Sequence, residues 1–210
     1  MYRSQRPWIV KLGGSLHDSP TLRAWLKIIA AAKAPVVIVP GGGPFADAVR
    51  KTQRNLKFSD RIAHRMALLA MEQYGLAMTG LVAGIRPTET QRSIAACLRA
   101  GETPVWLPTA TALGVPDIAE NWDVTSDSLA LWLAHRLRAR GLLLVKAARL
   151  PVGPRSAVEL ARMGIIDGEF PRMLASGDVP CWCIGARRHR EAARAFHSGN
   201  DPRATSICRK

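Results

Sequence analysis

The sequence predicts an α/β protein whose sheet is largely parallel and covered by helices on both faces. Residues 36–40 form an unbroken apolar run, typical of a strand that is buried on both sides. A second apolar run precedes it at residues 8–12, and residues 21–32 between them carry apolar side chains at helical spacing. A strand, helix and strand in this order form a right-handed crossover unit. Because 210 residues fit one domain of ordinary size, we expect a single domain over residues 1–210.

The first strand carries a lysine that needs a partner. Lys11 stands among apolar residues and is followed directly by Gly13, Gly14 and Ser15. An amine inside a buried strand is costly unless an anion or a polar cage receives it. Glycines without side chains let backbone N–H groups approach a bound group, and the serine adds a hydroxyl. A phosphate is the simplest partner, although an edge strand with Lys11 in water would also fit this segment alone.

A second glycine turn follows the strand at residues 36–40. Gly41, Gly42 and Gly43 precede a proline, and the helical spacing continues through residues 45–50. A turn that opens onto a helix N-terminus is an anion site, because free N–H groups and the positive end of the helix dipole face the same point. Neither turn matches the Gly-x-x-x-x-Gly-Lys-Ser/Thr or the Gly-x-Gly-x-x-Gly signature.

These two motifs resemble those of the amino acid kinase superfamily. The matching segments are Val-Lys-Leu-Gly-Gly-Ser at residues 10–15 and Val-Pro-Gly-Gly-Gly-Pro at residues 39–44. The resemblance implies a three-layer αβα sandwich with a mostly parallel sheet, and phosphoryl transfer from ATP with Mg²⁺. We expect two lobes within the domain, an acceptor lobe over about residues 1–120 and a nucleotide lobe over about residues 121–210.

Residues 121–134 indicate a further element of the site. Thr125 or Ser126 caps a helix, and Asp127 falls in its first turn, where a carboxylate is favoured by the helix dipole. On this pattern alone, Asp127 could do no more than stabilise the helix. The resemblance implies that Asp127 orients the phosphate-binding lysines and can attend the metal ion, so we assign it to the catalytic site.

A second lysine ends the apolar run at residues 141–146. Ligands of parallel sheets gather at the carboxyl ends of strands, which places Lys146 with Lys11 and the glycines. The resemblance adds Arg172 as a second basic group on the transferred phosphoryl, while Gly185 after the next strand is assigned to the nucleotide. Many relatives continue with an acidic turn where this chain has Ala-Ala-Arg-Leu at residues 147–150, so the nucleotide contacts depart from the family pattern.

The acceptor is predicted from the helix that begins after Ser59. Its Ile62, Met66, Leu69 and Gln73 share one side, which the resemblance places between subunits of a homodimer or higher oligomer. Arg61 and His64 lie on other sides, either facing an anionic acceptor group or simply solvated. The acceptor-binding set also includes Gly41, Gly42, Gly43, Asp47 and Asp123.

Residues 63–75 and 121–128 resemble the branch that phosphorylates 5-(aminomethyl)-3-furanmethanol phosphate to its diphosphate in methanofuran-type cofactor synthesis. An acceptor that combines a phosphate and an ammonium needs basic groups and one carboxylate, for which Asp47 and Asp123 are the candidates. A uridylate or isopentenyl phosphate kinase, or a non-catalytic oxyanion-binding protein of the same fold, are the alternatives.

The charge and the cysteines restrict the remaining classes. A net charge of +14 suits anionic ligands, and nucleic acid is disfavoured because the basic run at residues 187–190 has no interleaved aromatic residues. The cysteines form no Cys-x-x-Cys pair, and the histidines show no metal spacing. We expect a cytoplasmic protein without a membrane segment.

The expected reaction needs little more than these groups. Lys11, with Lys146 or Arg172, would neutralise the phosphoryl oxygens, and Gly13, Gly14, Gly42 and Gly43 would donate N–H groups. Mg²⁺ would arrive with ATP, held by phosphate oxygens and water. An acceptor phosphate is already ionised, so no general base is required.

Overall fold

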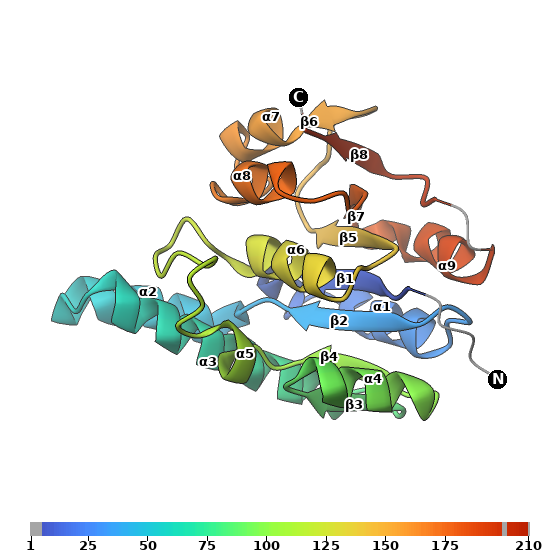
Figure 1. Ribbon diagram of the computed structural model, residues 1–210, viewed down its shortest axis with the longest axis horizontal. Helices are drawn as coiled ribbons and strands as arrows, with labels where there is room; N and C mark the ends of the chain where they lie inside the picture. Colours follow the sequence, from blue (N-terminus) through green and yellow to red (C-terminus); the bar gives the residue numbers. More distant parts are fainter. Residues whose placement is uncertain (1–5, 199–200, 210) are drawn as a thin grey trace.

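The sheet of this protein is mixed but almost entirely parallel (Figure 1). The computed structural model describes residues 6–198 and 201–209. In these residues eight strands form one sheet in the order β3-β4-β2-β1-β5-β7-β8-β6, and the β7–β8 pair alone is antiparallel. The strands are β1 (Trp8–Leu12), β2 (Val36–Pro40), β3 (Ile85–Thr88), β4 (Thr103–Trp106), β5 (Gly141–Lys146), β6 (Arg155–Ser156), β7 (Cys181–Gly185) and β8 (Thr205–Cys208).

Helices cover both faces of this sheet, so the expected three-layer αβα class is confirmed. The α-helices are α1 (Thr21–Ala30), α2 (Gly43–Leu56), α3 (Asp60–Thr79), α4 (Gln91–Arg99), α5 (Thr109–Ala112), α6 (Ser126–Arg136), α7 (Ala157–Arg162), α8 (Phe170–Ala175) and α9 (His189–Ser198). Two short 3₁₀ helices are η1 (Gly14–Leu16) and η2 (Ala186–Arg188). Within the described part of the chain, no helix has the length and apolar character that crossing a bilayer requires.

Side chains alternate across the central strands, and this alternation decides where the lysines point. Ile9 packs with α6 on one face, whereas Trp8 and Val10 pack with α1 on the other. Lys11 is two residues after Ile9 and therefore faces α6. In the β1–β5 register Lys11 lies opposite Leu144, whose side chain also packs on the α6 face. Lys146 is the next residue of β5 to point that way, so both lysines are directed at the same helix.

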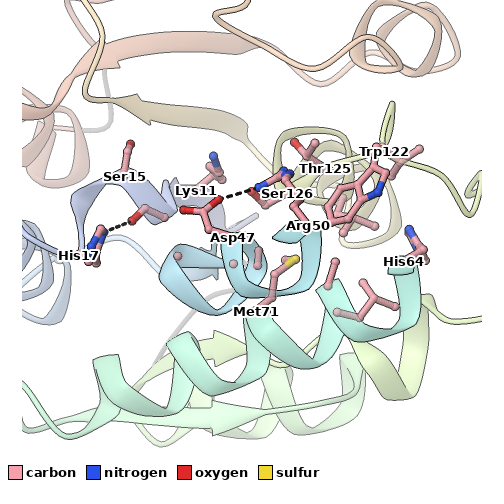
Figure 2. A pocket seen from close by; sticks show the side chains of 18 residues that line it. Lys11, Ser15, His17, Asp47, Arg50, His64, Met71, Trp122, Thr125 and Ser126 are labelled. Atoms are coloured by element: carbon pink, nitrogen blue, oxygen red, sulfur yellow. Dashed lines mark hydrogen bonds and ion pairs between the residues drawn. The ribbon is translucent and has the colours of Figure 1, made fainter. Parts of the chain in front are cut away.

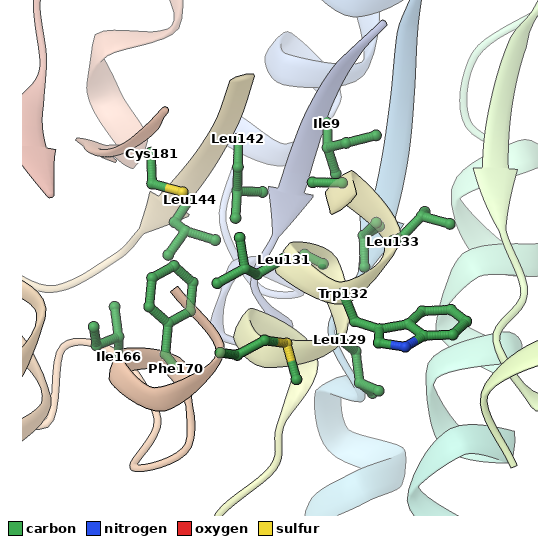
Figure 3. Close-up of a cluster of buried hydrophobic side chains, with 14 of the residues drawn as sticks. Ile9, Leu129, Leu131, Trp132, Leu133, Leu142, Leu144, Ile166, Phe170 and Cys181 are labelled. Carbon is green, nitrogen blue, oxygen red and sulfur yellow. The ribbon is translucent and has the colours of Figure 1, made fainter. Parts of the chain in front are cut away.

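The core beneath α6 holds this helix in a fixed position on the sheet (Figure 3). Leu129, Leu131 and Leu133 of α6 are at most 2% exposed and belong to one cluster with Leu142 of β5. Each buried leucine of this kind contributes about 1.5–3 kcal/mol relative to leaving it exposed. The helix that carries Asp127 is consequently anchored along its whole length.

The region of residues 80–120 was only partly predictable. The strand expected near residues 105–108 appears as β4, shifted towards its N-terminus. The helix α4 was not predicted; it begins with a capping box formed by the side chains and backbone of Thr90 and Ser93. Its apolar side is short, with Ile94 and Cys97 buried, so helical periodicity is weak there.

The α3 helix has apolar residues on two sides, one buried against the sheet and one exposed. Ile62 and Leu69, which were expected on the side between subunits, are 48% and 43% exposed in the single chain. The buried side carries large residues such as Met71 and Tyr74, but also Gly75, where a Cβ would lie 3.0 Å from the Leu107 side chain. This glycine lets α3 approach β2 and β4 closely, and this brings His64 inside the protein at 4% exposure.

Candidate functional site

Two lysines and one aspartate form a buried cluster at the carboxyl ends of β1 and β5. The Nζ atom of Lys11 lies 2.9 Å from one carboxylate oxygen of Asp127, and Nζ of Lys146 lies 2.5 Å from the other. The three side chains are at most 11% exposed. The expectation that these residues meet is therefore correct. The cluster holds two positive charges and one negative charge, so it attracts a further anion.

Burial and pairing act against each other in this cluster. Burial lowers the pKa of the Lys11 ammonium below 10.5, and Asp127 offsets part of this effect. Burial alone would raise the pKa of the Asp127 carboxyl, but the charges and hydrogen bonds of the two lysines outweigh it and hold that pKa below 3.8. Asp127 is thus a stable anion, and the surplus positive charge is costly until a ligand neutralises it.

The start of α6 is held by Asp167, a residue whose role the sequence analysis did not identify. Its Oδ2 accepts hydrogen bonds from Thr125 N at 2.9 Å, Thr125 Oγ1 at 2.7 Å and Ser128 N at 3.0 Å, and its Oδ1 accepts from Ser128 Oγ and Phe170 N. Burial and the nearby charge of Asp127 raise the pKa of Asp167. This carboxylate fixes the first turn of α6 and thereby the direction of Asp127.

Thr125 is the N-cap of α6, as expected from the sequence, and its side chain accepts from Asp127 N at 3.5 Å. No local sequence signal marks Asp167, because Thr125 and Ser128 are 42 and 39 residues away along the chain.

The two glycine turns interlock. A Cβ on Gly14 would lie 2.3 Å from the backbone nitrogen of Gly43, and a Cβ on Gly41 would lie 2.3 Å from that of Gly14. Gly43 also has a positive φ of 56°, a conformation that side chains disfavour. A Cβ on Gly13 would lie 3.4 Å from Nζ of Lys11, which places this turn at the cluster. The expected proximity of both turns and Lys11 is correct.

One cavity opens beside these turns, and we name it the Trp122 cavity. It has a volume of 300 Å³ and is lined by Lys11, Gly14, Gly42 and Gly43 at one end. In Figure 2, His64 and Trp122 lie at the opposite end from Ser15 and His17. Further lining residues are Asp47, Arg50, Met71 and Thr125.

Polar contacts hold the side chains of Arg50 and Trp122 in the wall of this cavity. Arg50 lies 4.5 Å from the centre of the Trp122 ring and pairs with Asp47 at 3.0 Å. The indole Nε1 donates a hydrogen bond of 2.7 Å to Gln53. Asp47 and His64 therefore lie in the cavity as expected, whereas Arg50, Met71 and Trp122 were not identified from the sequence.

A larger cavity of 740 Å³, which we name the arginine cavity, lies on the other side of η1. Its lining includes Leu16 of η1 and Gly185, as well as the segment 147–153 that follows β5. Gly14 and Ser15 of the same 3₁₀ helix line the Trp122 cavity. The two cavities thus share η1 as a common wall. The basic residues of the arginine cavity are Arg149, Arg187, Arg188 and Arg203.

Two of the residues expected to bind the acceptor lie elsewhere. Arg61 has a side chain that is 81% exposed and pairs with Glu120 at 3.0 Å, outside the lining of the Trp122 cavity. Asp123 is exposed, and its backbone carbonyl accepts a hydrogen bond from Glu169 N. Both corrections have a geometric reason, because the rotation of α3 and the bend before α6 turn these side chains outward.

Arg172 was expected at the transferred phosphoryl, and this expectation is wrong. It lies on α8, pairs with Glu169 and lines a separate cavity beside His135 and Arg136, near the C-terminal end of α6. Asp127 lies at the N-terminal end of that helix. Of the two basic candidates, Lys146 is therefore the one that the fold brings to Lys11.

The acidic side chains near the cluster do not form a set of ligands for a metal ion. Over residues 6–198 and 201–209, no three His, Cys, Asp or Glu side chains are grouped to hold one. Both oxygens of Asp127 face lysines. This donor set does not fit a metal held by the protein alone.

The fold and the site together define a class of protein that binds phosphate groups at the strand ends of a parallel sheet. The profile of the amino acid kinase family matches residues 6–148. The chain therefore belongs to the amino acid kinase family, and the expected ATP-dependent kinase is confirmed at this level.

Similar proteins agree with this assignment. The chain is 28% identical over 191 residues to the [5-(aminomethyl)furan-3-yl]methyl phosphate kinase of Methanocaldococcus jannaschii, covering 85% of this chain and 88% of that protein. The uridylate kinase of Archaeoglobus fulgidus has a TM-score of 0.71 at 14% identity, with 97% and 100% of the two chains covered. An isopentenyl phosphate kinase has a TM-score of 0.60 at 19% identity, with 96% and 100% covered. The two structural similarities concern the fold.

Proposed function

We propose that this protein transfers the γ-phosphoryl group of ATP to the phosphate of a small aminomethylfuran phosphate and forms its diphosphate. The observation that carries this proposal is the Lys11–Asp127–Lys146 cluster, which has a surplus positive charge. Lys11 lines the Trp122 cavity, and Lys146 directly precedes the segment 147–153 that lines the arginine cavity. The similarity to the Methanocaldococcus jannaschii kinase supports the acceptor, and synthesis of a methanofuran-type cofactor is the corresponding role.

The two cavities suit the two substrates. The arginine cavity, at 740 Å³, has room for a nucleotide, and its four arginines favour a polyphosphate. The Trp122 cavity, at 300 Å³, is near the lower limit of small-molecule sites, which is about 300 Å³, and suits a furan with two short arms. Both expected lobes contribute to each cavity, since Trp122 and Thr125 line the Trp122 cavity while Leu16 and Thr21 line the arginine cavity.

In the proposed reaction an oxygen of the acceptor phosphate attacks the γ-phosphorus. A new P–O bond forms as the bond to the bridging β–γ oxygen breaks, and ADP leaves with that oxygen. The acceptor oxygen is already ionised, so no side chain needs to remove a proton. Lys11 and Lys146 neutralise the oxygens of the moving group, while backbone N–H groups of Gly14 and Gly43 donate to the phosphates.

Magnesium would enter with ATP and supply further charge neutralisation, held by phosphate oxygens and water. A protein contact to this ion would pass through Asp127, after displacement of one of its lysines. We also keep a cytoplasmic location as part of the proposal, since Cys97, Cys181, Cys183 and Cys208 are free, which suits a reducing compartment.

A homodimer is the second part of the proposal. Ile62, Leu69 and Leu76 recur every seven residues along α3 and are 48%, 43% and 50% exposed. Apolar residues at this spacing form a stripe that two copies of the helix bury against each other. The expected subunit interface thus fits the exposed side of α3 better than the protein core.

The direct test is turnover by the purified protein with ATP and Mg²⁺. The aminomethylfuran phosphate, UMP and isopentenyl phosphate are compared as acceptors, with ADP release and the ³¹P signal of the diphosphate as readouts. Diphosphate formation from the furan with at least tenfold higher kcat/KM than from the other two is the expected result. A preference for UMP or isopentenyl phosphate would show that the proposed acceptor is wrong. ATP binding without any transfer would indicate a non-catalytic protein.

A further inference from the structure

His64 is a buried polar side chain that the proposed reaction does not use. It lies near the start of α3, is 4% exposed, and lines the Trp122 cavity with Trp122 and Met71 (Figure 2). This end of the cavity is remote from Ser15 and the glycine turns, where the phosphate groups would lie. A group that contacts His64 is therefore at the far end of the acceptor.

The hydrogen bonds of the His64 ring define which nitrogen is free. The backbone carbonyl of Asn121 lies beside the ring and acts to raise the pKa of His64, as a hydrogen-bond acceptor does, although burial outweighs it. Among the described residues, the Nε2 atom of His64 is buried without a hydrogen-bond partner. Because a carbonyl can only accept and Nε2 has no partner, we assign the proton of the neutral ring to Nδ1, on the side of Asn121. Nε2 then has a lone pair and can only accept a hydrogen bond.

The surroundings of His64 keep the ring neutral and favour a cationic ligand. Burial lowers the pKa of His64 below 6.5, although the nearby Glu120 carboxylate acts in the opposite direction. Glu120 pairs with the exposed Arg61, and Arg50 on the cavity wall is already paired with Asp47. A buried lone pair with a carboxylate behind it repels a phosphate and attracts an N–H donor.

We propose that Nε2 of His64 accepts a hydrogen bond from the primary ammonium group of the acceptor, at the end opposite its phosphate. This inference rests on the proposed function and deepens it, because it makes His64 the residue that selects amine-bearing acceptors. It also reverses the expectation from the sequence that His64 meets an anionic group of the acceptor.

The experiment compares the aminomethylfuran phosphate with an analogue in which a methyl group replaces the aminomethyl group. Wild-type protein is measured beside His64→Leu, which removes the lone pair, and His64→Gln, whose Oε1 can take the place of Nε2. His197→Gln, on the exposed side of α9, is the matched control. Thermal unfolding of each variant shows that it is folded.

The expected result is a selective loss. His64→Leu lowers kcat/KM for the aminomethyl acceptor about 10- to 100-fold, mainly through KM, because one hydrogen bond to a charged group is lost. The same variant changes kcat/KM for the methyl analogue less than about threefold, and His64→Gln recovers part of the preference. His197→Gln behaves like the wild type.

Two outcomes would overturn the inference, and they are distinguishable. Equal losses for both acceptors in His64→Leu would reject the His64 assignment while leaving the kinase reaction intact. If the protein instead phosphorylates UMP or isopentenyl phosphate and neither furan compound, its acceptor lacks this amine. The proposed function would then fail together with the inference.

Discussion

The Lys11–Asp127–Lys146 cluster leads to the sharpest prediction, for the substitution Asp127→Asn. This change keeps the shape of the side chain but removes the negative charge that two buried ammonium groups share at 2.9 and 2.5 Å. At the effective dielectric constant of proteins, one such pair is worth on the order of 4 kcal/mol before desolvation. Breaking a buried pair by removing one partner typically costs about 3–5 kcal/mol. We expect a loss of this size in the free energy of unfolding.

The effect on catalysis should be separate from the effect on stability. Without Asp127 the two ammonium groups repel each other, so they no longer hold the position that neutralises the moving phosphoryl group. Loss of one preorganised electrostatic group costs about 10²- to 10³-fold in kcat. We expect a decrease of this order, with the unfolding free energy partly restored by saturating ATP, because an anion bound only by the folded state stabilises it.

The assay is ADP release under saturating substrates, with urea unfolding measured in parallel. Asp178→Asn is the control, since that side chain is 96% exposed and pairs with Arg209 away from the cavities. A folded Asp127→Asn protein with kcat within about threefold of the wild type would refute the reasoning, because the cluster would then not act on the transferred group.

Four other results are expected. Gly14→Ala places a Cβ 2.3 Å from a backbone nitrogen of the neighbouring turn, so it should lower both kcat and the melting temperature, whereas Gly80→Ala, with its nearest contact at 3.6 Å, should be tolerated. Leu69→Glu should halve the particle mass measured by light scattering, while Val152→Glu on an exposed loop leaves it unchanged, and equal masses would contradict the dimer. Burial lowers the pKa of His64, so below about pH 6.5 the unfolded chain binds a proton that the folded chain does not, and stability falls as pH drops. His64→Gln should therefore lose less melting temperature than the wild type between about pH 7 and about pH 5, and parallel curves would contradict this. EDTA should abolish turnover and Mg²⁺ restore it, and turnover that persists in EDTA would exclude the metal requirement.

The phosphate end of the site was predictable because its signals are local. Lys11 and Lys146 stand out as charges at the ends of apolar runs, and parallel strands collect such residues at one edge of the sheet. Asp127 stands in the first turn of a helix, but its assignment to the site came from the resemblance to the kinase family and not from this position alone. The alternation of side chains along β1 and β5 then determines that the three groups face each other.

The acceptor end was much less predictable, since it depends on how helices rotate and bend. The close approach of α3 at Gly75 sets which side of the helix faces the sheet, and this orientation buries His64 and exposes Arg61. The prediction for Arg172 was wrong for a related reason, because this residue of the short α8 lies beside the C-terminal end of α6, away from Asp127. Asp167 joins partners about forty residues away, which no local pattern reveals.

The place of β1 in the middle of the sheet has a consequence for how this protein can change. Its backbone is paired on both edges, with β2 and β5, and its five residues are buried, so freeing Lys11 would require opening the central sheet. We expect the amides of this strand to exchange with solvent almost as slowly as global unfolding allows. The helices α2 and α3, by contrast, supply Asp47, Arg50 and His64 to the lining of the Trp122 cavity. Under the proposed function, a change of acceptor would therefore involve these helices, while Lys11 stays on a strand that cannot move without opening the sheet.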